Sequence, residues 1–520
     1  MGLKEAYLKV VEYLSKQNFP CKRPFIEYVI DKIHNDKENN PFFINAPTGY
    51  GKTFISMSVA LNELTNGYKT IISYPLRSLI EDQKFKINSF MDWIGKRDVV
   101  GCRYMGDATS IYLVYPITLT TIDTLSLTAL GISPEDTKSI FNELMGTNYG
   151  SLGHYIFSWA SVYTSTIILD EVHLLYDSSK SLSFLISLLK ISRELGNRLI
   201  FMSATIPDKF IQKLKKYHKN VIYEKFNKNI DPTFYEERKE KDYEIKLESY
   251  TSEEKLENIK NIIENDEKKF NRALIVFNTI EDAIKLYSMI KGNKILIHSR
   301  FSIKDREEKL KLIEKLSCQN KLIVIGTQAI EAGVDFSSDL IISEIAPPNS
   351  LIQRFGRFLR KYEKNGKAYI WYEENILNDD KKLNYKVYDK QLITRTIKYL
   401  EQHKSINLHI DFENFLNEVY VDDPKVDEKL VDEIIYIMFD LREPTKSAFK
   451  LLLEMEGSFI RDGNIFTAVT EDNIEVPVNY NFLRNRCIDP LLNEKDAIIK
   501  ALQGFKFRVK GKYDKEVGLV

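Results

Sequence analysis

The chain has few cysteines, no excess of either charge and no long run of hydrophobic residues. Its 520 residues include four cysteines, which lie too far apart for a zinc cluster or an obvious disulfide framework. This sparse use of cysteine fits a reducing interior, and we expect a cytoplasmic protein. Basic and acidic residues number 74 each, which argues against a globally positive surface that binds nucleic acid non-specifically. Any such partner must be held by a local groove.

Neither of two stretches fits a membrane or targeting segment. Residues 1–16 carry charges throughout and contain no hydrophobic signal core. Residues 108–122 are uncharged, but Pro116 and several hydroxyl residues interrupt them and Asp123 follows. We interpret this stretch as a buried strand and a loop rather than a membrane span.

A glycine-rich loop is the strongest signal in the sequence. It reads Ala-Pro-Thr-Gly-Tyr-Gly-Lys-Thr, after the apolar run 42–44 and before the amphipathic run 54–64. Strand, glycine turn and helix form the context of a phosphate-binding loop, in which backbone N–H groups and a helix start meet the phosphates. The predicted nucleotide-binding residues are Ala46, Pro47, Thr48, Gly49, Tyr50, Gly51, Lys52 and Thr53.

Two adjacent carboxylates, Asp170 and Glu171, follow the apolar strand predicted at 166–169. Uncompensated buried charges are costly, and a magnesium ion would account for them. We predict that Asp170 and the Thr53 hydroxyl hold Mg²⁺, that Lys52 contacts the β/γ-phosphates and that Glu171 orients or deprotonates the attacking water. The alternative for the acidic pair taken alone is a solvated turn.

A second specific signal is the arginine-rich phrase at 353–360. Arg357 and Arg360 are three residues apart, so a helix would place both on one face. Guanidinium groups aimed at a γ-phosphate stabilise the charge that develops in phosphoryl transfer. We therefore predict Gln353, Arg357 and Arg360 as catalytic residues, with an exposed basic helix end as the alternative.

Two further phrases are weaker when taken alone. Ser203 and Thr205 follow an apolar strand, where an ordinary cap or turn explains small hydroxyls equally well. Their order after the acidic box makes them, with His173, candidates for coupling the site to neighbouring motifs.

The phrase at 327–335 supplies Thr327 for a backbone phosphate, Gly333 for close approach and Asp335 for the nucleotide. An ordinary strand-to-helix loop remains the alternative for this phrase.

Short apolar strands alternate with helical stretches over most of the chain, which indicates parallel α/β sheets. The charged segment 236–246 interrupts this alternation, and after about residue 375 it fades into mainly helical sequence with a hairpin-like stretch at 465–478. The predicted strands lie at 42–44, 70–75, 111–121, 166–169, 199–202, 273–277, 295–297, 322–325 and 340–342.

Together these motifs resemble, in the same order, those of a superfamily 2 helicase. The resemblance implies two tandem RecA-like lobes at 1–231 and 232–377 and a mainly helical accessory domain at 378–520. It also implies ATP and Mg²⁺ in a cleft, with Lys52 and Glu171 on one wall and Arg357 and Arg360 on the other. Hydrolysis would open and close this cleft and step the protein along a strand.

Several shorter sequence segments resemble those of the helicase of type I CRISPR interference, a helicase–nuclease that degrades DNA. The matching phrases lie at 45–49, 74–80, 121–123, 277–279, 298–301, 327–335 and 343–347. The family implies 3′-to-5′ movement on single-stranded DNA and recruitment by an RNA-guided surveillance complex. The implied DNA contacts are Arg77, Thr121, Asn278, Thr279, Ser299, Arg300 and Thr327.

The sequence departs from that family in two places. None of its seven histidines is followed by aspartate and only residues 1–45 precede the loop, so we expect no nuclease activity and a separate HD-type nuclease subunit. Relatives often place an adenine-reading glutamine after Arg-Pro-aromatic, where this chain has Ile26. A general DNA-repair or RNA helicase remains the alternative enzyme, and a non-hydrolysing nucleic-acid clamp the alternative of another class.

Overall fold

The computed structural model describes residues 1–17, 22–104, 107–146, 155–176, 178–317, 321–331, 335–378, 384–439, 444–455, 457–460, 463–502 and 504–520. These form two compact units. The first comprises Met1–Asp231, Asp422–Ile465 and Leu491–Lys506, and the second comprises Pro232–Val421, Phe466–Pro490 and Phe507–Val520. The C-terminal residues thus contribute to both units instead of forming the single accessory domain that we expected.

The first unit is built on a seven-stranded parallel sheet in the order β3-β4-β2-β5-β6-β1-β7. Because helices cover both faces, the central strands are continuous apolar runs rather than alternating ones. The strands are β1 Phe42–Asn45, β2 Lys69–Tyr74, β3 Val100–Arg103, β4 Ile117–Thr121, β5 Ser165–Asp170, β6 Leu199–Ser203 and β7 Ile222–Lys225.

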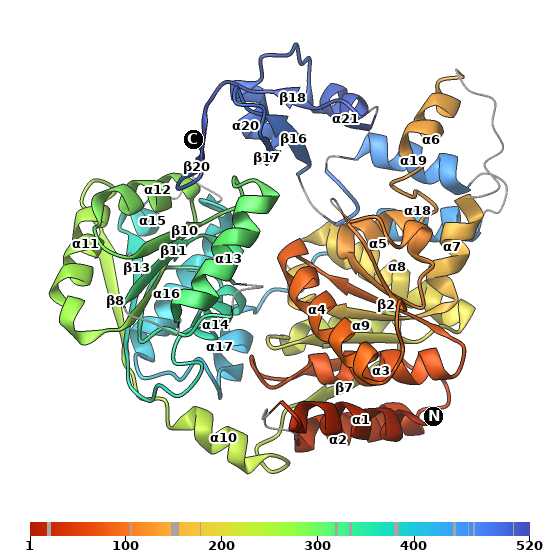
Figure 1. Cartoon of the computed structure of the whole chain (residues 1–520), viewed down its shortest axis with the longest axis horizontal. Helices are drawn as coiled ribbons and strands as arrows, with labels where there is room; N and C mark the ends of the chain where they lie inside the picture. The colour runs from red at the N-terminus through yellow and green to blue at the C-terminus, as the bar shows by residue number, and fades with distance from the viewer. Residues whose placement is uncertain are drawn as a thin grey trace. The chain divides into compact units, whose positions relative to one another are not determined.

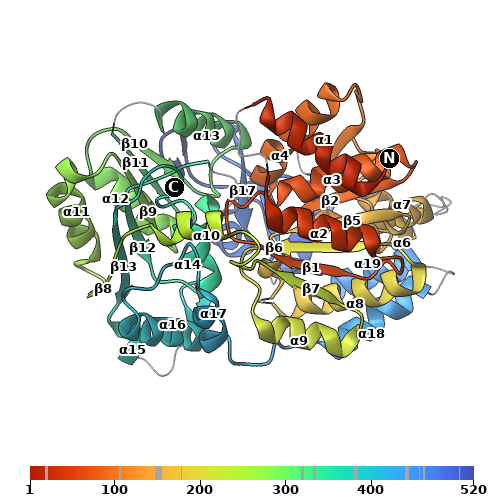
Figure 2. The ribbon, with the colours of Figure 1, turned by 90° about the horizontal axis from the view of Figure 1, so that it is seen from below.

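Helices α1, α3 and α4 lie on one face of this sheet, and α8, α9 and α18 lie on the other (Figure 2). The C-terminal helix α18 packs beside α8 (Figure 1) because Leu430, Ile434 and Phe449 of the C-terminal segment belong to the buried core of this unit. The helices are α1 Leu3–Ser15, α2 Pro24–Asn35, α3 Thr53–Thr65, α4 Arg77–Trp93, α5 Ile122–Ala129, α6 Thr137–Leu144, α7 Tyr155–Tyr163, α8 Ser179–Leu195, α9 Asp208–Tyr217, α18 Glu428–Phe439, α19 Pro444–Glu454 and α21 Glu494–Leu502, with 3-10 turns η1 Ile111–Leu113 and η2 Val172–Leu175.

One predicted strand is shorter than expected. The prediction placed a strand over 111–121, whereas β4 begins at Ile117 and the preceding residues form η1. Tyr112 and Leu113 adopt positive φ angles, which no strand tolerates, and Pro116 has no N–H for a ladder.

The second unit has a six-stranded parallel sheet in the order β10-β11-β9-β12-β13-β8. Helices α11 and α12 pack on one face of it through a shared apolar core, with α14, α16 and α17 on the other side (Figure 2). Its strands are β8 Ile245–Tyr250, β9 Arg272–Val276, β10 Lys294–Ile297, β11 Leu322–Gly326, β12 Leu340–Glu344 and β13 Lys367–Glu373. Its helices are α10 Pro232–Lys239, α11 Lys255–Asn265, α12 Ile280–Met289, α13 Ile303–Ser317, α14 Pro348–Phe355, α15 Asn375–Asn378, α16 Lys390–Gln402, α17 Glu413–Val419 and α20 Tyr480–Arg486, with 3-10 turns η3 Glu267–Lys269 and η4 Gln328–Ile330.

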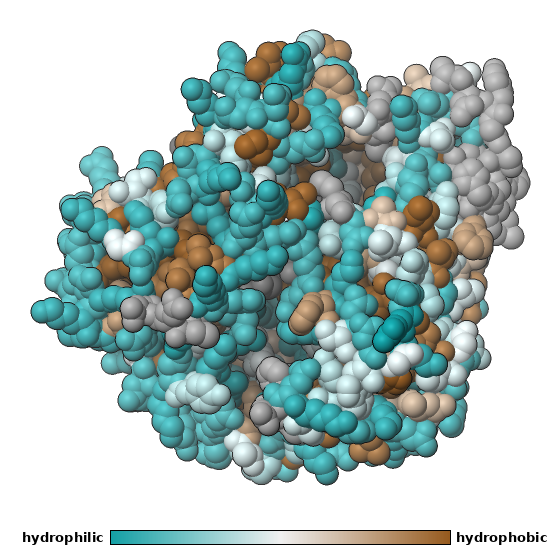
Figure 3. Space-filling view, viewed as in Figure 1, coloured by the Kyte–Doolittle hydropathy of each residue, from teal (hydrophilic) through white to brown (hydrophobic). Residues whose placement is uncertain are grey.

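Short strands complete the C-terminal part, where β16 pairs with β17, as the hairpin-like stretch indicated, and also with β18, which the sequence did not predict. They are β14 Asn384–Tyr385, β15 Tyr388–Asp389, β16 Ile465–Val469, β17 Glu475–Asn479, β18 Phe507–Arg508, β19 Tyr513–Asp514 and β20 Gly518–Leu519. On the face that Figure 3 shows, hydrophilic residues predominate and hydrophobic ones are scattered among them. Among the described helices, none combines the length and apolar composition that a membrane crossing requires.

Candidate active site

The glycine-rich loop joins β1 to α3 in the first unit. Gly49 and Gly51 adopt φ angles of 75° and 100°, the left-handed region that side chains disfavour. A Cβ on Gly51 would come within 2.9 Å of the Phe54 ring. In the described part of the chain, the backbone N–H groups of Gly49, Gly51, Lys52 and Thr53 donate to no protein acceptor. The loop therefore offers an array of N–H donors at a helix start, which suits a phosphate group.

Lys52 lies inside this loop and is 8% exposed. Its Nζ donates to the Ala46 carbonyl at 3.3 Å and lies 3.7 Å from Glu171 Oε1. Ala46 and Pro47 are buried, whereas Thr48 is half-buried and Gly49 is exposed. The ammonium group is thus fixed between the loop and the acidic pair, where it can neutralise a bound anion.

The acidic pair lies at the carboxyl end of β5. Glu171 has a φ of 53°, uncommon for a residue with a side chain, and it turns the chain sharply out of the strand. The Glu171 N–H donates to Asp170 Oδ1 at 2.9 Å. Burial, followed by the neighbouring Glu171 carboxylate, raises the pKa of Asp170 to about 7. The ionised form of this buried carboxyl is therefore disfavoured unless a cation lies nearby. Mg²⁺, which prefers oxygen ligands, fits this requirement.

The predicted coupling residues also meet at this edge of the sheet. His173 Nδ1 lies 2.9 Å from Ser203 Oγ and 3.3 Å from Glu171 Oε2. The Thr205 N–H donates to Ser203 Oγ at 3.2 Å. Because β5, β6 and β1 are neighbours in the sheet, their carboxyl ends bring the loop, the acidic box and these hydroxyls together.

Tyr50 turns away from the phosphate loop in which it stands. Its hydroxyl donates to Asp231 Oδ2 at 2.7 Å and accepts the Phe25 N–H at 3.0 Å. Its ring packs against Phe226, and its own N–H donates to the Pro47 carbonyl at 3.2 Å. The predicted nucleotide-binding role is therefore not served by the Tyr50 side chain or its N–H, because both are engaged by protein groups.

The arginine-rich phrase of the second unit does not form one helical face. Helix α14 ends at Phe355, so Arg357 and Arg360 lie beyond it, which corrects the prediction of a shared helix. The reason is a local bridge: Leu359 has a positive φ and donates its N–H to the Ser338 carbonyl at 2.8 Å. The chain therefore leaves the helix to pair with a neighbouring segment.

The predicted catalytic and nucleotide residues of the second unit differ in exposure. Gln353 is buried, whereas the Arg360 side chain is 27% exposed and its Nη1 lies 3.7 Å from Asp335 Oδ1. Arg357 Nη2 donates to the Glu331 carbonyl at 3.3 Å. Gly333 lies outside the described residues.

Arg354 is an internal residue that the sequence analysis did not single out. It is completely buried, and its guanidinium binds Glu331 Oε1 at 2.8 Å, the Glu344 carbonyl at 2.8 Å and Asn278 Oδ1 at 3.0 Å. The phrase contains three arginines at 354, 357 and 360, and nothing in their spacing tells which one turns inward. Arg354 ties three of the predicted motifs to one another.

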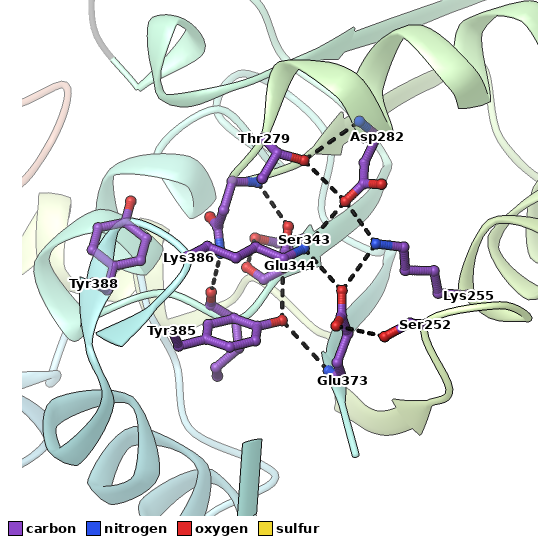
Figure 4. A network of polar contacts seen from close by, with 12 residues as sticks. Ser252, Lys255, Thr279, Asp282, Ser343, Glu344, Glu373, Tyr385, Lys386 and Tyr388 are labelled. Atoms are coloured by element: carbon purple, nitrogen blue, oxygen red, sulfur yellow. Dashed lines mark hydrogen bonds and ion pairs between the residues drawn. The ribbon is translucent and has the colours of Figure 1, made fainter. Parts of the chain in front are cut away.

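A buried polar network holds the predicted DNA-contact residues Asn278 and Thr279. Figure 4 shows Thr279 in this network beside Asp282. The Asn278 N–H donates to Glu344 Oε2 at 2.7 Å and its amide donates to the Ile345 carbonyl at 2.8 Å. Thr279 caps α12 by accepting the Asp282 N–H. The Asn278 side chain is therefore committed to the protein interior, and Thr279 acts locally as a helix cap.

The cations of this network are Lys255 and Lys386. Lys386 Nζ lies 2.5 Å from Glu344 Oε1, 3.1 Å from Glu373 Oε1 and 3.2 Å from Asp282 Oδ2. Lys255 Nζ binds Asp282 and Glu373 at 2.7 and 2.9 Å (Figure 4). Burial lowers the pKa of Lys386, but the carboxylates outweigh it, Glu344 first, and raise it overall. The network is thus charge-paired, as buried ions require.

Three of the other predicted DNA contacts, Arg300, Arg77 and Thr121, are also engaged locally. Arg300 Nη2 binds Glu281 Oε1 at 2.8 Å, and its guanidinium lies 4.5 Å from the Phe482 ring centroid. Arg77 Nη2 lies 3.3 Å from Glu81 Oε1, and Thr121 caps α5. Ser299 is exposed and Thr327 is buried.

Comparison with known proteins agrees with this architecture. Residues 23–214 match the DEAD/DEAH box helicase family, and residues 269–363 match the C-terminal family of the CRISPR-associated nuclease/helicase Cas3. The chain therefore matches the helicase class over one segment of its first unit and over one segment of its second.

Within that class, the chain is similar to Cas3. It is 30% identical to a putative CRISPR-associated nuclease/helicase Cas3 of Methanocaldococcus jannaschii, over 75% of this chain and 53% of that protein. The crystal structure of T. fusca Cas3 shares its fold with a TM-score of 0.67 at 14% identity, covering 96% of this chain and 71% of that one. The crystal structure of T. fusca Cas3-ATP has a TM-score of 0.62 at 14% identity, covering 93% of this chain and 67% of that one. The chain spans about half the length of the curated relatives it matches.

Proposed function

We propose that this chain is an ATP-dependent translocase and helicase that moves 3′ to 5′ on single-stranded DNA in type I CRISPR interference. The observation that carries the proposal is the edge of the first sheet, where Lys52, Asp170 and Glu171 meet beside a row of unengaged N–H donors. The similarity to Cas3 proteins, one of them solved with ATP, supports the choice of nucleotide and pathway.

The residues of the first unit supply binding and proton transfer. The loop N–H groups and Lys52 bind the phosphates, while the Thr53 hydroxyl and Asp170 are oxygen donors that would hold Mg²⁺. When bound, Mg²⁺ neutralises phosphate charge. Glu171 takes the proton of the attacking water, and His173 orients that carboxylate from 3.3 Å. From the second unit we assign Gln353, Arg357 and Arg360 to stabilising the γ-phosphoryl charge.

The test compares ATP hydrolysis by the wild type and by Lys52→Ala with single-stranded DNA, duplex DNA and structured RNA. We expect stimulation by single-stranded DNA, falling as salt rises, and loss of hydrolysis in the variant. Stimulation by structured RNA but not by single-stranded DNA would favour an RNA helicase. Equally slow hydrolysis by both proteins would favour a nucleic-acid clamp.

Direction and partners need separate assays. A duplex with a 3′ single-stranded extension should be unwound, and one with a 5′ extension should not. We also propose that an RNA-guided surveillance complex recruits the chain and that a separate HD-type nuclease subunit cuts the DNA, in line with the similarity to CRISPR-associated nuclease/helicase proteins. DNA cleavage by the purified chain alone would contradict the division of labour.

A further inference from the structure

Two buried cations lie at the start of the second unit, on and just after helix α10. Arg238 and Lys241 are 8% and 7% exposed, although such residues are seldom buried. Arg238 Nη1 donates to the Arg360 carbonyl at 3.0 Å. Lys241 Nζ donates to the Lys361 carbonyl at 2.9 Å and to the Glu363 carbonyl at 2.7 Å. Both cations thus bind the backbone of the segment that carries Arg360.

Backbone contacts extend this pairing. The Asp242 N–H donates to the Lys364 carbonyl at 2.7 Å, and the Gly366 N–H donates to the Asp242 carbonyl at 3.3 Å. Asp242 and Asn365 form an isolated parallel bridge. Residues 238–242 and 360–366 therefore run side by side as a clamp, and Asn407 secures it by donating to the Arg238 carbonyl at 3.0 Å.

The clamped segment needs such support because it has no regular secondary structure. Helix α14 ends at Phe355, and the next regular element, β13, begins at Lys367. A side chain that must meet a reacting group needs its backbone held to about 0.5 Å. The clamp fixes the carbonyls at 360, 361 and 363, while the Arg360 guanidinium stays partly exposed and paired only weakly, at 3.7 Å, with Asp335.

We propose that Arg238 and Lys241 are positioning residues that hold the backbone of residues 360–366 and so aim the Arg360 side chain. The inference rests on the proposed hydrolysis of ATP for its effect on rate, but the clamp itself can be measured without it. Loss of either cation should loosen the segment and lower kcat, and it should leave the KM for ATP nearly unchanged because the phosphate loop is untouched.

The test uses the full chain with Arg238→Gln and Lys241→Gln, the conservative variants Arg238→Lys and Lys241→Arg, and Lys239→Gln as the matched control. Lys239 is exposed on the same helix. Hydrogen exchange of peptides spanning 356–366 should become about tenfold faster in the Gln variants, as expected when a charge-assisted hydrogen bond is lost. Under saturating single-stranded DNA, kcat should fall about tenfold or more with KM within about twofold. The conservative variants should recover part of both effects.

Combining Arg238→Gln with Arg360→Ala should cost little more than Arg360→Ala alone, since both changes act on one group. Exchange no faster than in Lys239→Gln would overturn the clamp, whatever the ATPase activity. Faster exchange with an unchanged kcat in an active enzyme would overturn the positioning role. A wild type without Lys52-dependent hydrolysis would instead refute the proposed function, and the exchange measurement would still decide the clamp.

Discussion

The polar sites of the two units are constructed in opposite ways. In the first unit, Lys52 and Asp170 lie beside N–H donors that no protein group accepts in the described residues, and burial raises the pKa of Asp170. In the second unit, Arg354 and Glu344 are completely buried among matched partners. In the first arrangement, donors and charges remain available to bind a ligand. In the second, the charged groups pair with one another and hold the motifs in place. Changes in the first should therefore alter turnover, and changes in the second should first alter stability.

Arg360 tests this comparison most severely, because it lies in the second unit but its side chain is 27% exposed and its Nη1 lies 3.7 Å from the nearest Asp335 oxygen. We expect Arg360→Ala to lower the ATPase rate about 10³-fold or more, as for loss of an arginine finger, with an unchanged melting temperature. The matched control is Lys361→Ala, whose Nζ lies 3.4 Å from the same Asp335 carboxylate. Near-normal turnover by Arg360→Ala would contradict its assignment.

Glu171→Gln examines the first-unit site itself. Removing the base should lower turnover about 10²- to 10⁴-fold, while ATP binding, measured by calorimetry, should persist because Lys52 and the loop remain. Glu194, exposed on α8, provides the control substitution Glu194→Gln. A variant that lost ATP affinity in proportion to its rate would show that Glu171 serves binding rather than chemistry.

Arg354→Leu examines the second-unit network. The change leaves the carboxylate of Glu331 and the amide of Asn278 without the guanidinium, and we expect a loss of about 3–5 kcal/mol in the free energy of unfolding. Denaturant unfolding measures it, with exposed Arg484→Leu as the control. Unchanged stability combined with lost turnover would show that Arg354 serves the reaction and not the stability of the second unit.

The sequence predicted most of what the first unit shows. Its loop and acidic box are contiguous motifs at the ends of apolar strands, so local pattern and strand order suffice to bring Lys52 and Glu171 together. Most strands of both sheets were predicted for the same reason, but β13, which lies between β12 and β8, and the edge strands β3 and β7 were not. Strand β8, which lies at the sheet edge and is partly exposed, was missed because it lacks a continuous apolar run.

The second-unit site escaped sequence reasoning because its partners are distant along the chain. Arg354 donates to Asn278, which lies 76 residues earlier in the chain. Lys386 binds Glu344 and lies in a short hairpin that no sequence motif predicts. The helix expected for Arg357 and Arg360 failed for a related reason, since the bridge to Ser338 is a tertiary contact that outweighs local spacing. Sequence motifs indicate the residues that contact a ligand, but they do not indicate the distant residues that hold those motifs in position.

Lys386→Met refines the comparison within the network. Glu344 would keep its charge while buried and lose its closest cation, which should lower stability by about 3 kcal/mol. Adding Glu344→Gln should recover part of the loss, since the uncompensated charge disappears. Exposed Lys404→Met is the control in thermal unfolding. A double variant less stable than Lys386→Met would show that hydrogen bonds of Glu344 matter more than its charge.

Tyr50→Phe should give the smallest effect. It tests whether the first unit, like the second, contains buried polar contacts that hold a motif in place. Its hydroxyl joins the phosphate loop to Asp231, and Pro232, the next residue, begins the second unit. Losing a hydrogen bond to a carboxylate should cost about 2 kcal/mol, while the ring still fills its buried site. Tyr68→Phe, at a position that is 62% exposed, is the control in denaturant unfolding. If Tyr50→Phe lowered turnover more than stability, the phosphate loop would depend on its contact with the junction, and the first unit would share the construction of the second.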